Sequence, residues 1–195
     1  IDDSLRISTY QRLLSFEAPP DPGSFSERER RVLRMLVASV LDKSVPTSTS
    51  LEVSCALLWQ HPQVRAEIVE LLEVLAPRVE HVNRPLPTHP DVPLQVHARY
   101  SRLEILGAFG VGSGARIQPW QSGVFWANEA RADLFAFTLD KTSGQFSPTT
   151  RYRDYAISRE LIHWESQSAT RADSNTGVRY RTHLQAGSNV MLFAR

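Results

Sequence analysis

Apolar residues in the first part of the chain recur every three or four positions, the spacing of one face of an α-helix. Ser26 and Glu29 form a capping box, in which a serine and a glutamate cap a first helical turn reciprocally. The apolar repeat after it predicts a helix to about Lys43. Two further repeats predict helices over residues 51–60 and 62–76, the second beginning with a proline that suits a first turn.

Prolines mark both ends of this helical part. Residues 1–25 contain the run Ala-Pro-Pro-Asp-Pro-Gly, which predicts a linker or an irregular wrap. Four more prolines follow residue 82 in quick succession. We therefore place the end of the helical module or linker at residue 81, so that it covers residues 1–81.

A short helix and a glycine-rich segment come next. Ser101 and Glu104 form a second capping box, and we expect Gly107 and Gly110 to end the helix that it begins. Residues 110–114 read Gly-Val-Gly-Ser-Gly, which resembles a phosphate-binding loop. The loop lacks the Lys-Ser/Thr ending and no clear strand precedes it, so we interpret it as a flexible connection.

The remainder shows short apolar runs separated by Asn, Ser and Gly turns, the pattern of β-strands. Residues 82–195 therefore predict a β-rich domain whose strands form a mixed or closed sheet, in effect a small barrel. The fold class expected for the whole chain is α+β. The expected strands cover residues 124–126, 134–140, 162–165, 178–183 and 190–194.

Charge is distributed unevenly along the chain. The net charge is +1, but residues 1–81 carry 9 Lys/Arg against 12 Asp/Glu, whereas residues 82–195 carry 13 against 9. Nearly all the basic residues are arginines, which suit bidentate contacts with phosphate. A GC-rich genome produces the same excess, so the asymmetry gives only mild support for an anionic partner.

Composition bears on where the protein works. The chain is 42% hydrophobic and 22% charged, which is ordinary for a globular protein. It contains no run of about 18 apolar residues and shows no secretory leader. The single cysteine, Cys55, excludes an internal disulfide and a multi-cysteine metal site. We expect a cytoplasmic location and, because the first residue is Ile1 rather than Met, a larger parent protein.

Motifs of known hydrolases are missing from the sequence. It has neither a G-x-S-x-G nucleophile elbow nor an H-E-x-x-H zinc helix, and its histidines lack ligand spacing. We expect no catalytic residue, metal or cofactor. One alternative stays open, because Asp140 and Glu165 imitate the acidic pair of a metal-dependent nuclease. Gln167 stands where such a nuclease usually has a lysine, and Lys141 could replace it.

Aromatic and basic residues alternate in the β-rich half. Aromatic rings stack on bases at ~1–3 kcal/mol each, and arginines neutralise phosphates. The alternative is that the tryptophans form the core and the arginines are solvated. As a group they favour nucleic-acid binding. The aromatic members are Trp120, Phe125, Trp126, Tyr152, Tyr155, Trp164 and Tyr180, and the arginines are Arg116, Arg151, Arg153, Arg179 and Arg181.

A long run in this half carries a family resemblance. It reads TLDK, then FSPTTRYRDYAIS and ELIHWESQS, followed by TGVRYRTH and NVMLFAR, with HARYSRLEIL and WQSGVFW upstream. The run resembles the domain of unknown function 3427, strongly over residues 95–195 and loosely before them. That domain lies at the C-terminal end of bacterial proteins with a phospholipase-D-type nuclease and a superfamily 2 helicase. In SauUSI-type enzymes it recognises methylated DNA.

The resemblance implies target recognition in a modification-dependent (type IV) restriction system. It also implies that the partners are duplex DNA containing modified cytosine and the nuclease and helicase domains of the same parent chain. By analogy with other readers of modified bases, we expect the β-barrel to be PUA-like or SRA-like.

A reader of modified cytosine has to recognise one small group. Because a single methyl is worth only ~1 kcal/mol of burial, we expect the base to leave the duplex and enter a pocket. Aromatic rings can stack on it there, and a carboxylate can accept from its exocyclic amine. Methyl and hydroxymethyl both remain open. The predicted pocket residues are Asp140, Tyr152, Asp154, Tyr155 and Trp164. The predicted DNA-binding residues are Arg116, Lys141, Thr149, Thr150, Arg151, Arg153, Gln167, Arg179 and Arg181.

Overall fold

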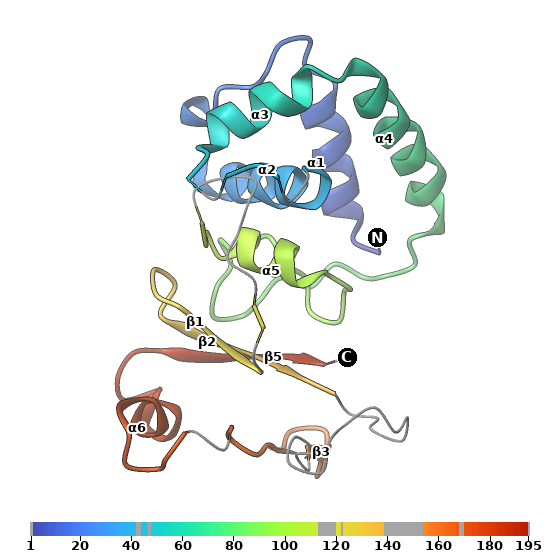
Figure 1. Ribbon diagram of the computed structural model, residues 1–195. Helices are drawn as coiled ribbons and strands as arrows, with labels where there is room; N and C mark the ends of the chain where they lie inside the picture. Colours follow the sequence, from blue (N-terminus) through green and yellow to red (C-terminus); the bar gives the residue numbers. More distant parts are fainter. Residues whose placement is uncertain are drawn as a thin grey trace. The chain divides into compact units, whose positions relative to one another are not determined.

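The computed structural model describes residues 2–41, 44–46, 48–112, 120–121, 123–138, 154–167 and 170–194. The chain forms two compact units, Ile1–Pro119 and Trp120–Arg195 (Figure 1). Each unit has a core of its own.

The first unit is helical. Three of its helices, α2, α3 and α4, confirm the amphipathic repeats in the sequence. Their apolar faces, together with that of α1, supply most of the buried side chains of this unit. The helices are α1 (Ser4–Leu14), α2 (Glu27–Val40), α3 (Leu51–Trp59), α4 (Pro62–Leu75) and α5 (Arg102–Ala108), with short 3-10 turns at η1 (Pro22–Ser24) and η2 (Ala76–Arg78).

Helix α1 corrects the expectation that residues 1–25 form a linker or irregular wrap. The side chain of Asp3 accepts a hydrogen bond from the backbone N–H of Arg6 at 3.1 Å and so caps the helix. The buried face then repeats at helical spacing. Only the proline-containing part after this helix is irregular. The buried apolar residues of α1 are Ile7, Tyr10, Leu13 and Leu14.

Both predicted capping boxes are present. Ser26 caps α2 with Glu29, and Ser101 caps α5 with Glu104. In each box the serine hydroxyl accepts from the backbone of the glutamate, and the glutamate carboxylate accepts from the backbone of the serine. Local sequence therefore sets the starting points of these two helices.

Gly107 lies inside α5, so the expectation that it ends the helix is wrong. A side chain at this position would meet the backbone of Met35 at 3.2 Å. The glycine therefore allows α5 to lie directly against α2. Gly110 does end the helix: it takes a φ of 75°, and the N–H of Val111 donates to the carbonyl of Leu106 at 2.9 Å.

A buried polar network joins α1 to the start of α5. The guanidinium of Arg6 lies 2.6 Å from the Glu104 carboxylate and 4.4 Å from the centre of the Tyr100 ring, and it donates to the carbonyl of Arg99 at 3.1 Å. The Tyr100 hydroxyl donates to Asp3 at 2.5 Å. Because a buried charge needs a partner, this network ties α1 to residues 99–104, near the other end of the first unit.

Residues 82–112 accordingly pack within the first unit. Among the residues described there, the β-structure is limited to an isolated bridge between Pro85 and Gln95. The change of sequence pattern at residue 82 is a change from regular helices to an irregular segment. The boundary between the two compact units lies later, between Pro119 and Trp120.

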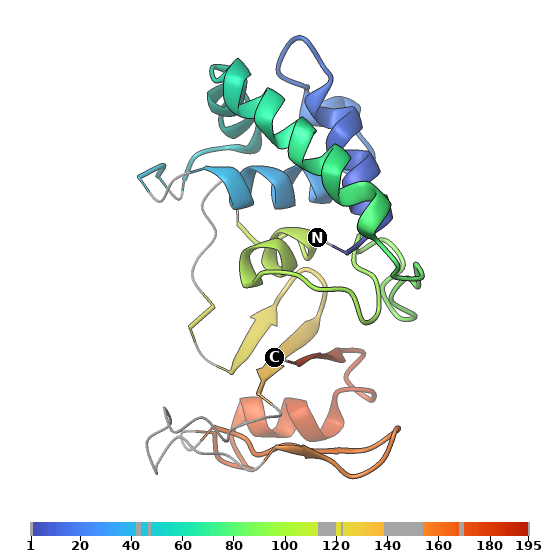
Figure 2. The same cartoon turned by 90° about the vertical axis from the view of Figure 1, so that its right-hand side faces the viewer.

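The second unit contains a three-stranded sheet, a two-stranded pair and one helix. Strand β2 is central, antiparallel to β1 and parallel to β5. Figure 1 and Figure 2 show the helix and the β3–β4 pair on the same side of the three-stranded sheet. The elements are β1 (Val124–Ala127), β2 (Ala132–Phe137), β3 (Tyr155–Ala156), β4 (Ile162–His163), α6 (Asn175–Thr182) and β5 (Asn189–Ala194).

The α+β fold class is confirmed, and four of the five expected strands are present in whole or in part. The strands that the structure describes form two open sheets, so the expected PUA-like or SRA-like barrel is not seen among them. The parallel pairing of β2 with β5 joins segments more than 50 residues apart, with Leu134 opposite Met191.

The expected strand over residues 178–183 is wrong, because residues 178–182 belong to helix α6 and His183 is its C-cap. Ser174 caps the helix by accepting the N–H of Gly177 at 3.1 Å. A side chain at Gly177 would collide with the carbonyl oxygen of Arg171, so the turn before the helix requires glycine there. The Asn-Thr-Gly sequence is therefore the first turn of a helix rather than a turn between strands.

Alternation along β2 gives the three-stranded sheet two different faces. On one face, Trp120 packs against Phe125 and Phe193 with ring centroids 6.3 and 6.0 Å apart. The other face carries Asp133 and Phe135, and α6 packs there.

Among the described residues, no helix is both long enough and apolar enough to cross a membrane.

Candidate nucleic-acid interface

A short β-hairpin carries two of the predicted pocket residues, Asp154 and Tyr155. Strands β3 and β4 pair antiparallel, with Tyr155 opposite His163 and Ala156 opposite Ile162. The Asp154 carboxylate accepts the backbone N–H of Glu165 at 3.1 Å. This bond closes the base of the hairpin, so Asp154 has a structural role whatever else it does.

Tyr155 presents an aromatic ring to solvent. Its ring lies on that of His163 with centroids 4.8 Å apart and an interplanar angle of 12°, a stacked arrangement. Tyr155 nevertheless stays 51% exposed. A core role for Tyr155, the alternative for an aromatic residue in this segment, does not fit this exposure. The backing by His163 fixes the orientation of the ring.

Trp164 lies in an aromatic cluster on the α6 side of the three-stranded sheet. Its ring centroid is 4.2 Å from that of Phe135 on β2 and 5.6 Å from that of Tyr180 on α6, and the last two rings are 5.1 Å apart edge to face. Burial raises the pKa of the Tyr180 phenol. This packing joins the hairpin, the sheet and the helix, so Trp164 contributes to the core of the unit.

Arg179 is held by a buried carboxylate. Its Nε and Nη2 donate to the two oxygens of Asp133 at 2.8 and 2.7 Å, and Asp133 is fully buried. The guanidinium also lies 4.3 Å from the centre of the Trp126 ring. The hydrogen bonds to Asp133 raise the pKa of Arg179. The pair fixes α6 to the sheet, and contact of Arg179 with a phosphate stays a prediction.

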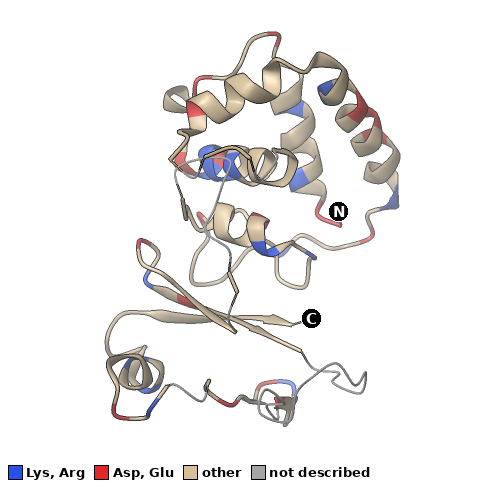
Figure 3. Cartoon of the chain, viewed as in Figure 1, with Lys and Arg blue, Asp and Glu red and all other residues tan. Residues whose placement is uncertain are grey.

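The other described members of the predicted DNA-binding set lie apart from this pair. Arg181 is exposed on α6, and its Nη2 donates to the carbonyl of Ala172 at 2.8 Å. The side-chain amide of Gln167 lies beside Gly123, just before β1. Figure 3 shows basic residues on α6, and the turn before it carries both a basic and an acidic residue, Arg171 and Asp173. The surface around α6 is therefore of mixed charge rather than uniformly basic.

All of the remaining predicted site residues lie outside the part of the chain that the structure describes. The acceptor Asp140 and the ring of Tyr152 are among them, so the structure neither brings them to the hairpin nor separates them from it. The predicted DNA-binding residues that also lie outside the described part are Arg116, Lys141, Thr149, Thr150, Arg151 and Arg153.

The structure does not test the acidic pair of the nuclease alternative, because Asp140 lies outside the described segments. Glu165 is half-buried, and its backbone N–H donates to Asp154. Across the described ranges, no group of three or more His, Cys, Asp or Glu side chains is placed to hold a metal ion.

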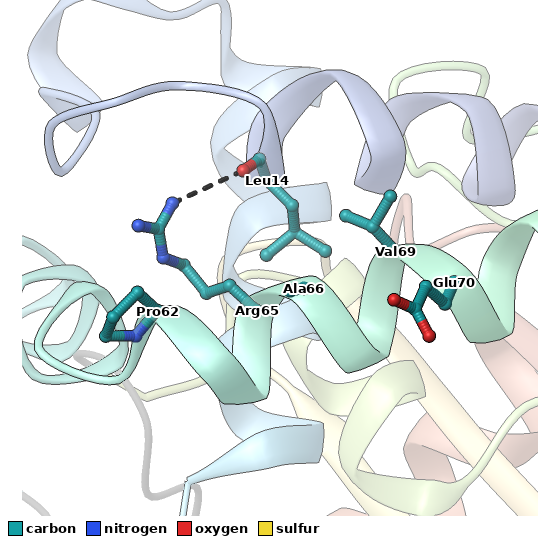
Figure 4. A pocket seen from close by; sticks show the side chains of 6 residues that line it. All are labelled: Leu14, Pro62, Arg65, Ala66, Val69 and Glu70. Carbon is teal, nitrogen blue, oxygen red and sulfur yellow. Dashed lines mark hydrogen bonds between the residues drawn. The ribbon is translucent and has the colours of Figure 1, made fainter.

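The first unit has a surface pocket of about 340 Å³ between α1 and α4 (Figure 4). Four of its lining side chains are apolar. The guanidinium of Arg65 donates to the carbonyls of Leu14 and Phe16 at 3.4 and 3.1 Å and lies 5.0 Å from the centre of the Trp59 ring. These contacts of Arg65 attach α4 to the end of α1. The lining residues are Leu14, Pro62, Arg65, Ala66, Val69 and Glu70.

The predicted site residues include neither His163, which stacks on Tyr155, nor Asp133, which pairs with Arg179. Asp133 stands inside an apolar strand, and a carboxylate in such a run needs a buried cation. His163 lies as far after the Ser158–Glu160 turn as Tyr155 lies before it, which is the spacing of a hairpin pair. Both signals are present in the sequence. The helical state of the segment carrying Arg179 concealed the first of them.

The family model of the Domain of unknown function (DUF3427) matches residues 94–195, about half of the chain. The match spans α5 of the first unit and the whole of the second. Comparisons with curated proteins and with solved structures give no match to this chain.

Proposed function

The chain belongs to the DUF3427 family, and on that premise we propose that residues 120–195 form a DNA-recognition module for modified cytosine. The module binds duplex DNA, the 5-methyl- or 5-hydroxymethylcytosine leaves the base stack, and its ring stacks on Tyr155. Recognition itself needs no catalytic residue, metal or cofactor in this chain.

The exposed, backed ring of Tyr155 carries the proposal. An aromatic ring that stacks on His163 and remains 51% exposed has one face held in place and another available to a base. Base–aromatic stacking is worth ~1–3 kcal/mol. Trp164 is a weaker candidate, since Phe135 and Tyr180 pack against its ring. A contribution from Tyr152 stays a prediction.

The acceptor for the exocyclic amine is better supplied by Asp140 than by Asp154. Adjacent side chains of an extended strand point to opposite faces, so Asp154 lies on the other face from Tyr155. Its carboxylate also closes the hairpin through the N–H of Glu165. We therefore assign Asp154 to positioning the hairpin and keep Asp140 as the proposed acceptor.

The proposal extends to the parent protein. In a modification-dependent restriction enzyme, this module selects the DNA and the nuclease and helicase domains of the same chain act on it in the bacterial cytoplasm. Closure of the three-stranded sheet into a PUA-like or SRA-like barrel is a further part of the proposal. Strand pairing outside the described residues would have to supply it.

The test compares the affinity of the 195-residue chain for duplexes that differ only in one 5-methyl group. Wild type should prefer the methylated duplex, Tyr155→Phe should keep that preference, and Tyr155→Ala should lose affinity by roughly 5- to 150-fold, the equivalent of one stacking interaction. Absence of any preference in the wild-type chain would overturn the proposal.

The same samples test the nuclease alternative. Incubation with Mg²⁺ should leave the methylated duplex intact if the chain is a recognition module only. Cleavage that is abolished by Asp140→Asn and Glu165→Gln would instead establish the nuclease. Glu165→Gln is suitable because the described contact of Glu165 with Asp154 uses its backbone N–H, which the substitution keeps.

A further inference from the structure

One face of the β3–β4 hairpin carries two aromatic rings and, at its tip, two aliphatic side chains. Tyr155 is paired with His163, and the N–H of Ile157 donates to the carbonyl of Leu161 at 2.9 Å, so these two residues form the next opposed pair. Because side chains alternate along extended strands, all four lie on the same face. Ile157 is 59% and Leu161 62% exposed, which leaves two aliphatic side chains in solvent at the tip.

The turn that presents these side chains is held by its own hydrogen bonds. The N–H of Ser158 donates to the carbonyl of Leu161 at 3.1 Å. The Ser158 hydroxyl accepts from the N–H groups of Glu160 and Leu161, both at 3.1 Å. At the other end, Asp154 ties the hairpin to Glu165. The tip is therefore ordered before any partner arrives.

Such a tip is unusual for a segment that only needs to fold. A single exposed aliphatic residue is ordinary, but Tyr155, Ile157 and Leu161 are all exposed and belong to two neighbouring pairs of the same hairpin. Among the residues that the structure describes, only His163 makes a ring contact with Tyr155. An exposed apolar face of this kind is typical of an interaction surface.

We propose that Ile157 and Leu161 insert into the DNA base stack beside the extruded cytosine, an inference that rests on the proposed function. Apolar side chains that enter base steps unstack them and lower the cost of extruding a base. Two residues of a strand span ~7 Å, so the aliphatic pair lies about 7 Å from Tyr155 along the hairpin, and the ring can hold the extruded base while the tip reaches the duplex. The hairpin then holds the flipped base with its ring and fills the stack with its tip.

The charge at the tip suits this partner. Arg159 lies in the turn between the two aliphatic residues and is exposed, where a guanidinium can meet the phosphates on either side of an opened step. Glu160 is also exposed, which limits the attraction to a local contact at the tip. The patch is small and combines one ring with two aliphatic side chains, and a base step presents the matching flat surface.

The test uses the 195-residue chain carrying Ile157→Ser with Leu161→Ser. A matched control is Leu184→Ser, which removes an aliphatic side chain that is 77% exposed after α6. Each protein is titrated with a methylated duplex and with the same duplex carrying an abasic position opposite the methylated cytosine, which removes the pairing in advance. A 2-aminopurine beside the target reports unstacking.

The double variant should bind the intact methylated duplex about tenfold more weakly or worse, recover most of this loss on the pre-opened duplex, and show no 2-aminopurine brightening on the intact one. Leu184→Ser should match wild type. Tyr155→Ala should lose affinity for both duplexes, because the flipped base lacks its ring in either case. Ile157→Ala with Leu161→Ala serves as a second version if the serine variant does not fold.

The outcomes separate the insertion from recognition. If wild type prefers methylated DNA but the double variant binds the intact duplex equally well, the insertion is wrong and the recognition stands. An equal loss on both duplexes would also overturn it, since the tip would then contact something other than the stack, such as a protein surface. If wild type has no preference for methylated DNA, the recognition proposal fails first.

Discussion

Each of the two compact units contains an arginine that is paired with a carboxylate and lies against an aromatic ring. In the first unit, Arg6 is 3% exposed, pairs with Glu104 at 2.6 Å and lies 4.4 Å from the Tyr100 ring. In the second, Arg179 pairs with Asp133 at 2.7 Å and lies 4.3 Å from the Trp126 ring. The chemistry of the two pairs is the same, but the buried partner differs.

In the first unit the guanidinium is buried, whereas in the second the carboxylate is. Asp133 has no exposed side-chain surface, while the Arg179 side chain keeps a quarter of its own. The first pair closes a core between helices. The second fixes a helix to a sheet and leaves its cation partly exposed. The helical unit therefore uses its arginine pair inside the core. The second unit leaves an arginine, Arg179, and an aromatic ring, Tyr155, partly exposed.

The largest expected effect comes from breaking the pair in the second unit. Arg179→Ala leaves the Asp133 carboxylate buried without its cation and should lower the free energy of unfolding by about 4 kcal/mol. Arg181→Ala, two residues along the same helix, should change it by less than about 0.5 kcal/mol because Arg181 is exposed. Urea unfolding with hydrogen exchange in residues 132–137 measures both.

A double-mutant cycle sharpens this result. Asp133→Asn in the Arg179→Ala background removes the unpaired charge and should recover part of the lost stability. If Arg179→Ala and Arg181→Ala prove equally mild, the pair does not hold α6 on the sheet. The cycle also matters for DNA binding, because any loss of affinity in Arg179→Ala has to be measured on folded protein.

The second prediction compares the two capping boxes of the first unit. Glu104 and Glu29 each cap a helix and each accept an arginine of α1 at 2.6 Å, but only Arg6 is buried, whereas Arg12 is exposed. Glu104→Ala should cost about 3 kcal/mol, since Arg6 loses its carboxylate. Glu29→Ala should cost about 1 kcal/mol, mostly the cap. Thermal unfolding compares them, and equal losses would show that burial of the pair adds nothing.

The pH dependence of the Glu29 contribution follows from its pKa. Hydrogen bonds from Ser26, and then the nearby Arg12, lower the pKa of the Glu29 carboxyl. A lowered pKa in the folded protein means stability that is present above the unfolded pKa of about 4.3 and lost as the pH falls through the folded value. The difference between wild type and Glu29→Ala should therefore shrink in acid.

The smallest effect at neutral pH is expected from Tyr10→Phe. The Tyr10 hydroxyl is buried and has no hydrogen-bond partner within the described residues, so its loss should leave stability unchanged or raise it by up to about 1 kcal/mol. Tyr100→Phe is the control. It removes the hydrogen bond to Asp3 and should cost about 1.5–3 kcal/mol.

Both phenylalanine variants should gain stability relative to wild type at high pH. Burial raises the pKa of both phenols in the folded protein. A raised pKa means stability that is present below the unfolded value of about 10 and lost as the pH rises beyond it. Tyr10→Phe should therefore gain stability relative to wild type above pH ~10. A parallel pH profile for variant and wild type would contradict burial of the phenol.

Local sequence determined the helical part of the chain to a large extent. The capping boxes at Ser26 and Ser101 predict where α2 and α5 begin, because the bonds that form them join residues three apart. The apolar repeats predict α2, α3 and α4. The buried residues of α1 have helical spacing, but the proline run after the helix predicts an irregular segment over the whole of residues 1–25 and so conceals it.

In the second unit, the alternation Val178-Arg179-Tyr180-Arg181 predicts a strand, yet the segment is helical. Its apolar and polar positions alternate because Tyr180 packs on Phe135 while Arg179 reaches Asp133, and these partners lie more than 40 residues away. The candidate interface shows the same division. The residue types of Tyr155 and Asp154 predict a pocket. In the folded hairpin, Tyr155 is exposed to solvent, whereas Asp154 accepts the N–H of Glu165 where the two strands begin and end.

The sequence by itself thus determined helices α2 to α5 of the first unit, the two capping boxes, the strands β1, β2 and β5 and the family of the chain. Each of these depends on residues close together or on a long matching run. Tertiary structure alone decided the parallel pairing of β2 with β5, the helical state of α6 and the exposed stack of Tyr155 on His163. The physical reason is range. Burial, ion pairing and ring stacking act between residues that only the folded chain brings together.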